Sequence, residues 1–249
     1  MSGHSKWATI KHQKGAKDKA RGKLFAKLIR QLEVAAREGG GDLDANPTLR
    51  TMYTKARAAS VPMDTIERAI KRGTGELEGV VYESVSYEGY APAGVAVLVE
   101  VLTDNRNRTA SDIRNIFTKN GGSMAEPGAV SWQFSRKGVV ITVRSASEDD
   151  VMTAALEAGA DDVVDDGDSW RVTCEPHDVE TVRAALEAAG VTVESAEATM
   201  VSSTAVPLDN AEDAKKVLRV MDALEDHDDV QNVYSNFDIP DAILETVEA

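Results

Sequence analysis

The 249-residue sequence has little of several features on which common protein classes depend. It has one cysteine, Cys174, which excludes a disulfide framework and a cysteine-based structural zinc site, because both need several cysteines. No apolar run reaches the roughly 18 residues of a membrane span, so we expect no membrane partner. The segment from Met1 to Lys6 lacks the apolar core of a signal peptide. We therefore expect a cytoplasmic protein.

Patterns that indicate catalysis or metal binding are also missing. The four histidines (His4, His12, His177 and His227) occur at no metal-ligand spacing, and the glycine clusters lack a following Gly-Lys-Ser/Thr. The acidic run at 161–168 does not follow the ligand spacing of an EF-hand loop. Cys174 lies in an apolar strand, where a buried structural thiol is the expected role. We predict no catalytic residue, no metal, no cofactor and no enzyme.

What the sequence does have is an uneven distribution of charge. The formal net charge is −14, but residues 1–73 carry 16 Lys or Arg against 7 Asp or Glu, a net of +9. Residues 74–249 carry 12 basic and 35 acidic residues, a net of −23. Such asymmetry is typical of proteins that bind nucleic acid or membranes, and the alternative is a solvated basic helix.

The first third of the chain predicts a basic arm followed by a small helical bundle. Residues 1–22 are rich in Lys and Gly and poor in large apolar residues, which predicts a mobile arm. From Lys23, apolar residues recur at helical spacing until Gly39-Gly40-Gly41. Asn46-Pro47 predicts the start of a second helix, and Asp64, with a capping box, that of a third. We expect three short helices around one core.

The remainder predicts two α+β units. Residues 138–200 follow the order β-α-β-β-α-β, the ferredoxin-like split motif. A second unit can be assembled from 93–134, with a helix opening at Thr109 and a strand at 130–134, together with 204–237. The predicted fold is α+β: an N-terminal three-helix bundle, then two ferredoxin-like domains, one inserted in the other. The expected limits are a basic arm at 1–22, a bundle at 23–75, a discontinuous domain at 76–136 plus 204–240, and an insertion at 137–203.

Two groups of basic residues are candidate phosphate contacts. Lys neutralises phosphates and Trp can stack on an exposed base, although Trp7 could instead dock the arm onto the bundle. The first group is His4, Lys6, Trp7, Lys11, His12, Lys14, Lys17, Lys19, Arg21, Lys23, Lys27 and Arg30. The second group lies at a predicted strand-to-helix turn, where helix N–H groups favour an anion, and comprises Arg106, Arg108, Arg114 and Lys119. These cations could instead pair internally with Glu100, Asp104 or Asp112.

Several stretches resemble the signature sequences of the YebC/PmpR family, which includes the mitochondrial translational activator of cytochrome oxidase. They are Gly3-His4-Ser5-Lys6-Trp7, Lys11-His12, Lys23-Leu24-Phe25, residues 73–79 (Gly-Thr-Gly-Glu-Leu-Glu-Gly), Tyr87-Glu88-Gly89-Tyr90 and residues 102–109 (Leu-Thr-Asp-Asn-Arg-Asn-Arg-Thr). The resemblance covers residues 2 to about 240. It implies a cytoplasmic, non-enzymatic protein of three domains, with no catalytic residues. Members are described as transcriptional regulators that bind DNA, and others resemble ribosome-associated factors that help translation of sequences such as proline runs.

We therefore expect a nucleic-acid-binding regulator of gene expression, with DNA and ribosomal RNA as competing partners. The helix near residues 64–72 places its cations mostly toward its end, which suits groove entry poorly. The basic arm on an acidic body suits a crevice between RNA segments. A protein-binding adaptor, with the basic arm incidental, is the alternative from a different class, since fold alone does not decide function.

Overall fold

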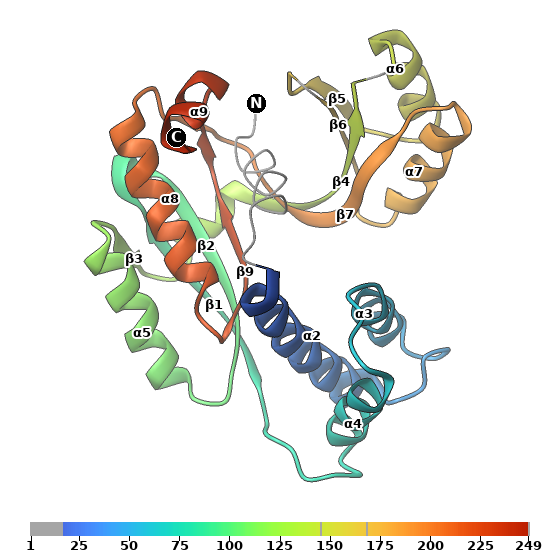
Figure 1. Ribbon diagram of the computed structural model, residues 1–249, viewed down its shortest axis with the longest axis vertical. Helices are drawn as coiled ribbons and strands as arrows, with labels where there is room; N and C mark the ends of the chain where they lie inside the picture. Colours follow the sequence, from blue (N-terminus) through green and yellow to red (C-terminus); the bar gives the residue numbers. More distant parts are fainter. Residues whose placement is uncertain (1–16, 145, 168, 249) are drawn as a thin grey trace.

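A computed structural model describes residues 17–144, 146–167 and 169–248, and Figure 1 shows them in three groups. The first group contains three helices, α2 (Lys17–Gly39), α3 (Pro47–Ala58) and α4 (Met63–Thr74). Their apolar faces meet in one hydrophobic cluster, in which Leu32, Leu49 and Ile66 are fully buried. The predicted helical bundle is confirmed.

Polar contacts fix the three helices relative to one another. Asn46 caps α3 by accepting from the Leu49 N–H at 3.0 Å, and its Nδ2 donates to the carbonyls of Ala35 and Gly40, both at 2.8 Å. Arg72 of α4 donates from Nε to the buried Glu33 carboxylate of α2 at 2.7 Å. A single asparagine thus both starts α3 and joins it to α2.

Two predictions about this region are wrong. Because α2 starts at Lys17, residues 17–22 continue the helix instead of belonging to a mobile arm; residues 1–16 lie outside the described part of the chain. The predicted cap at Asp64 is also displaced. The N-cap of α4 is Pro62, which has no capping side chain, and Asp64 lies within the first turn, where it pairs with Arg68.

The second group is a four-stranded sheet in the order β3-β1-β2-β9, with three helices on one face (Figure 1). Valines of β2 and β9 pack with Ile113, Phe117 and Leu224 of the helices in one core. β8 and β10 pair beside the sheet. The elements are β1 (Glu83–Tyr90), η1 (Pro92–Gly94), β2 (Ala96–Thr103), α5 (Arg106–Lys119), β3 (Ser123–Ala125), β8 (Val206–Pro207), α8 (Ala211–Glu225), β9 (Val230–Ser235), β10 (Phe237–Asp238) and α9 (Asp241–Glu248).

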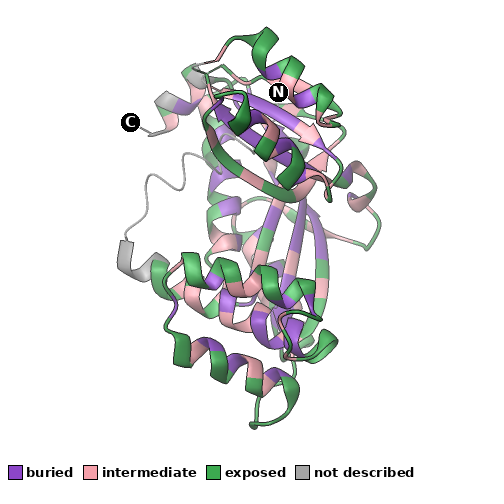
Figure 2. Ribbon diagram, turned by 90° about the vertical axis from the view of Figure 1, so that its right-hand side faces the viewer, coloured by how far each residue is buried: buried purple, intermediate pink, exposed green. Residues whose placement is uncertain are grey.

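The third group is the inserted unit, and it has the predicted β-α-β-β-α-β order. Its sheet order, β5-β6-β4-β7, with antiparallel pairs throughout, is that of the ferredoxin-like motif. Val140, Val172 and Leu186 lie at the centre of its separate core. The elements are η2 (Ser131–Gln133), which precedes the unit, β4 (Phe134–Val143), α6 (Glu148–Glu157), β5 (Asp162–Asp165), β6 (Ser169–Cys174), α7 (Val179–Ala188) and β7 (Val193–Ser202). Figure 2 shows buried positions on the strands and on parts of the helices, and exposed positions along the outer sides of the helices.

The strand expected at 130–134 is wrong, and so is the connectivity of the first sheet. Residues 131–133 form the short helix η2, and Phe134 is already the first residue of β4. The strand that follows α5 is instead β3, which pairs with β1, so β1 lies between β3 and β2. The first sheet therefore has a ferredoxin-like strand order, but its chain enters at a central strand.

Candidate nucleic-acid interface

The predicted N-terminal site lies partly outside the described residues. His4, Lys6, Trp7, Lys11, His12 and Lys14 belong to residues 1–16. Lys17 and Lys19 are in the first turn of α2, and Arg21, Lys23, Lys27 and Arg30 follow along the same helix. Arg21 is exposed, with its guanidinium 5.3 Å from the centre of the Phe25 ring. Six predicted cations thus belong to one continuous helix.

Lys23, Lys27 and Arg30 form a stripe on α2, since residues spaced by four and three positions share a helix face. The stripe meets residues 225–229 (Glu-Asp-His-Asp-Asp), here named the acidic turn, between α8 and β9. Lys23 Nζ lies 2.8 Å from the Asp226 carboxylate and 2.9 Å from the Asp226 carbonyl oxygen. Lys27 Nζ donates to the Glu225 carbonyl at 3.1 Å. Two cations predicted to bind a ligand, Lys23 and Lys27, are therefore already paired within the chain.

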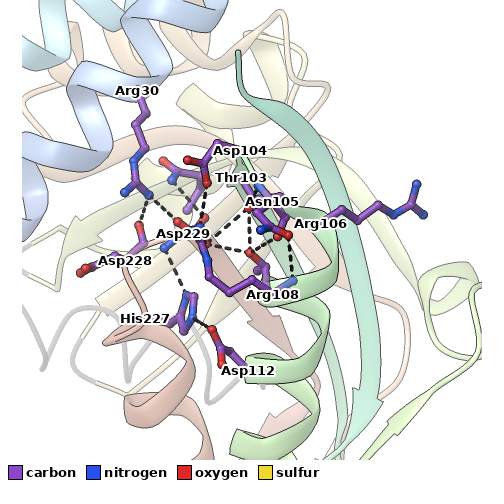
Figure 3. A network of polar contacts seen from close by, with 12 residues as sticks. Arg30, Thr103, Asp104, Asn105, Arg106, Arg108, Asp112, His227, Asp228 and Asp229 are labelled. Carbon is purple, nitrogen blue, oxygen red and sulfur yellow. Dashed lines mark hydrogen bonds and ion pairs between the residues drawn. The ribbon is translucent and has the colours of Figure 1, made fainter. Parts of the chain in front are cut away.

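Arg30 completes the stripe with three contacts. Its Nη1 donates to the Asp228 carbonyl and, at 3.1 Å, to Oδ1 of Asp229. Its guanidinium also lies 5.5 Å from the centre of the Tyr82 ring. Figure 3 shows Arg30 reaching from α2 into this network. The planar guanidinium suits a position that combines hydrogen bonds with an aromatic ring contact.

Asp229 is the centre of the network, and only 6% of its side chain is exposed. Its Oδ2 accepts from Thr109 Oγ1 at 2.7 Å and from Arg108 Nη2 at 2.9 Å. Burial by itself would raise the pKa of Asp229, but the hydrogen bonds from Thr109 and Arg108, with the charges of Arg30 and Arg108, hold the pKa below its ordinary value. Asp229 is therefore an ionised, fully engaged carboxylate that joins α2, α5 and β9.

The second predicted group lies on α5, which starts earlier than Thr109. Asn105 is the N-cap and accepts from the Arg108 N–H at 3.1 Å, so the helix N-terminus is capped from within the chain. Arg108 is paired with Asp104 at 2.8 Å as well as with Asp229. For Arg108, the internal pairing considered as the alternative is the observed arrangement.

The four members of the second group do not share one face of α5. At about 100° per residue, Arg106 and Arg114 lie within about 80° of each other, and Arg108 and Lys119 lie on another side of the helix. Arg106, Arg114 and Lys119 are exposed. In Figure 3 the Arg106 side chain points away from the network. These residues therefore form separate cationic points and not one patch.

A cleft of about 540 Å³ opens where α2, α5 and the acidic turn meet. Its lining contains two arginines, five aspartates, His227 and Tyr82. The Nδ1 atom of His227 faces the Asp229 N–H at 3.2 Å, and its Nε2 lies 3.4 Å from Asp112. An excess of carboxylates repels a phosphate. With five aspartates against two arginines, the cleft is therefore poorly suited to a phosphate.

The described residues contain no group of three or more His, Cys, Asp or Glu that could hold a metal ion. In the same part of the chain, no helix has the length and hydropathy needed to cross a membrane. The thiol of Cys174 is buried, and burial, followed by the charge of Asp178, raises its pKa, which suits the structural role expected for it.

Sequence reasoning did not identify the acidic turn as the partner of α2. The turn is visible as an acidic run, but the chain has many such runs, and this one lies about 200 residues from α2. Buried Asp229 follows another aspartate, Asp228, and precedes a strand, and neither neighbour marks it as a shared acceptor. Only the packing of α2 beside α5 and β9 assigns it.

Comparison with known proteins identifies one family along nearly the whole chain. Residues 5–76 match the family model described as "TACO1/YebC protein N-terminal domain", and residues 82–237 match "TACO1/YebC second and third domain". A relative from Syntrophobacter fumaroxidans is 56% identical and one from Thermobifida fusca is 59% identical. The alignments cover 99% of this chain and 100% of the first relative, and 98% of both chains for the second. Both relatives are named "Probable transcriptional regulatory protein", which is the name of a regulator and not of an enzyme.

A crystal structure of a conserved hypothetical protein from Aquifex aeolicus is similar in fold and sequence. It superposes with a TM-score of 0.78 at 46% identity, covering 92% of this chain and 95% of that one. This likeness supports the mixed α/β architecture with an N-terminal helical region. On the matched family models and the relatives, the chain belongs to the TACO1/YebC family.

Proposed function

We propose that this protein is a non-enzymatic regulator of gene expression that binds nucleic acid through its basic N-terminal segment, residues 4–30. One observation carries the proposal: this segment has nine Lys or Arg and one acidic residue, Asp18, on a chain of net charge −14. Lysines that neutralise phosphates release counterions, and this release supplies most of non-specific nucleic-acid affinity. The regulator names of the relatives support the same class.

The structure refines which cations are available for this role. Lys23, Lys27 and Arg30 are engaged with the acidic turn, so the first phosphate contacts are assigned to residues that precede Lys23. Arg106, Arg114 and Lys119 remain proposed as secondary contacts because they are exposed. Arg108 is assigned to the internal network instead.

Ribosomal RNA is the second candidate partner, and the cations of α4 favour it over a DNA groove. A DNA-reading helix presents free side chains from its first turns. On α4, Arg68 pairs with Asp64, and Arg72 pairs with the buried Glu33 in the last turn. Arg72 is therefore unavailable for base recognition, and Arg68, held only by a weak exposed pair of 3.8 Å, is the one arginine that α4 could offer to a groove. Co-sedimentation with ribosomes, compared with genome-wide DNA occupancy in the same cells, separates the two partners.

Charge reversal of the N-terminal segment tests the proposal. The test variant replaces Lys11, Lys14, Lys17 and Lys19 with Glu. Lys23 is left unchanged because a glutamate there would face Asp226 and disturb the fold. A matched control reverses four exposed cations elsewhere: Lys55, Arg57, Lys215 and Arg219.

Both variants have the same net charge, so they differ only in where the charge was changed. We expect the N-terminal variant to bind a labelled single-stranded RNA and duplex DNA far more weakly at low salt, with a residual affinity that is still measurable, and the control to lose much less. Equal affinity of the wild type and the N-terminal variant would overturn the proposal. Circular dichroism spectra of the three proteins check that each is folded.

A further inference from the structure

The acidic turn offers α2 the same chemical groups that a nucleic-acid backbone would offer. The stripe of Lys23, Lys27 and Arg30 is met by carboxylates of Asp226 and Asp229 and by three carbonyl oxygens. All of these groups are acceptors, and two of them carry negative charge. Phosphate oxygens satisfy lysine and arginine in the same way. The stripe is therefore occupied by an internal set of acceptors that resembles its proposed ligand.

The contact between α2 and the acidic turn is polar. None of the four hydrophobic clusters in the described part of the chain joins residues of α2–α4 with residues of the two sheets. The outermost pair is open to water, with 76% of the Asp226 side chain and 27% of the Lys23 side chain exposed. Exposed ion pairs are weak and are screened by salt, and polar interfaces between domains permit relative motion. The inner pair, Arg30 with Asp229, is mostly buried, so a competing polyanion displaces the contact from its exposed Lys23 end inward, and no hydrophobic core has to open.

We propose that the acidic turn is an intramolecular competitor that closes the α2 stripe, and that nucleic acid opens it by replacing the turn's acceptors with phosphates. The inference rests on the proposed function and adds two states of the protein to it. In the closed state the acidic turn covers the stripe, and in the open state it does not. In the closed state only the cations before Lys23 face a ligand. In the open state Lys23, Lys27 and Arg30 join them, so the bound segment becomes longer and affinity rises.

Closing the stripe weakens nucleic-acid binding. The apparent dissociation constant is the constant of the open state divided by the fraction of molecules that are open. Weakening the closed state must therefore tighten binding. Asp226→Asn removes the exposed carboxylate that pairs with Lys23 and leaves the buried Asp229 intact. Asp209→Asn is the matched control, because Asp209 is exposed and lies before α8, away from the turn in sequence.

Fluorescence anisotropy with a labelled single-stranded RNA at low salt measures the effect. We expect Asp226→Asn to bind several-fold more tightly than the wild type, up to about fivefold for one exposed ion pair, and Asp209→Asn to bind like the wild type. Equal affinities of Asp226→Asn and Asp209→Asn would overturn the competitor while leaving the proposed function standing. If the wild type and all variants fail to bind, the proposed function fails, and the competitor fails with it.

A cross-link tests the closed state directly. The variant Lys23→Cys with Asp226→Cys places two thiols at the outermost pair, and the native Cys174 is buried and protected from the reagent. A reducible bismaleimide then locks the turn onto α2. We expect the locked protein to bind RNA at least fivefold more weakly than the same protein after the linker is reduced. Unchanged affinity on reduction would overturn the proposal, and the comparison within one variant removes the effect of losing Lys23.

Discussion

Replacing Asp229 with asparagine tests whether this carboxylate joins the helical bundle to the sheet. Both oxygens of Asp229 accept hydrogen bonds: Oδ1 from Arg30, and Oδ2 from Thr109 and Arg108. An asparagine has one acceptor and one NH₂ group. In either orientation, the NH₂ group therefore faces at least one donor. The amide oxygen is expected to face Thr109 and Arg108, with the NH₂ group against Arg30.

The structure sets the size of the effect. Removing one partner of a buried ion pair costs about 3–5 kcal/mol, and a hydrogen bond to a charged group is worth about 1.5–3 kcal/mol. The Arg108 side chain is 48% exposed and stays hydrated, and asparagine retains one acceptor, so the cost falls below that of breaking a buried pair and close to that of one hydrogen bond to a charged group. We expect Asp229→Asn to lower the free energy of unfolding by about 2–3 kcal/mol.

The loss of stability caused by Asp229→Asn should become smaller at acid pH. The folded-state pKa of Asp229 lies below its ordinary value of 3.8, so ionisation stabilises the fold at pH values above 3.8. This contribution is lost as the pH falls through the lower, folded-state pKa. The difference between the wild type and Asp229→Asn should thus be constant near neutral pH and shrink below pH 3.8.

Urea unfolding, followed by circular dichroism, measures the difference. A loss of about 2–3 kcal/mol lowers the midpoint by about 1–2 M urea. Asp228→Asn is the control, since Asp228 meets Arg30 through its carbonyl and its side chain is exposed (Figure 3). Coincident unfolding curves for the wild type and Asp229→Asn at pH 7 would refute the assigned role of Asp229.

Three further substitutions test the packing. Glu88→Gln should destabilise the 128–131 loop by about 2 kcal/mol: burial by itself would raise the pKa of Glu88, but three backbone N–H bonds to the carboxylate lower it, so the loss should shrink as the pH falls below 4.5. Gly138→Ala should lower thermal stability by about 1–3 kcal/mol, since the new methyl would lie 2.5 Å from the Cys174 sulfur. Arg72→Met should cost about 3 kcal/mol in urea unfolding by leaving Glu33 buried and unpaired. Wild-type stability in any of the three contradicts the corresponding contact.

The inserted unit could be predicted closely because its elements are local and strongly periodic. Helix spacing and the glycines at positive φ, Gly159 and Gly190, mark the ends of α6 and α7. The first sheet was harder. Residues 130–134 look like a strand because Val130 and Phe134 are apolar, yet both are buried to anchor the short helix between them. An apolar residue is buried both in a core strand and beside a short helix that it anchors, and the local sequence pattern does not distinguish the two.

The candidate site was predicted in part. The charge of α2 is visible in the sequence, but Lys23 and its partner Asp226 are separated by 203 positions. No pattern in either segment specifies the other, and the pairing depends on how the bundle packs against the sheet. The start of α5 shows the same limit on a small scale. Asn105 and Thr109 are both acceptable caps, and the bond from Thr109 to buried Asp229 places Thr109 inside the helix.

The dependence of nucleic-acid affinity on salt tests most directly the claim that residues 4–30 bind phosphates. For a single strand, the slope of log affinity against log salt is about −0.7 for each phosphate neutralised. Replacing Lys11, Lys14, Lys17 and Lys19 with Glu should therefore make the slope shallower by about 3. The control variant at Lys55, Arg57, Lys215 and Arg219 should keep the slope of the wild type. A wild-type slope in the N-terminal variant would contradict the account.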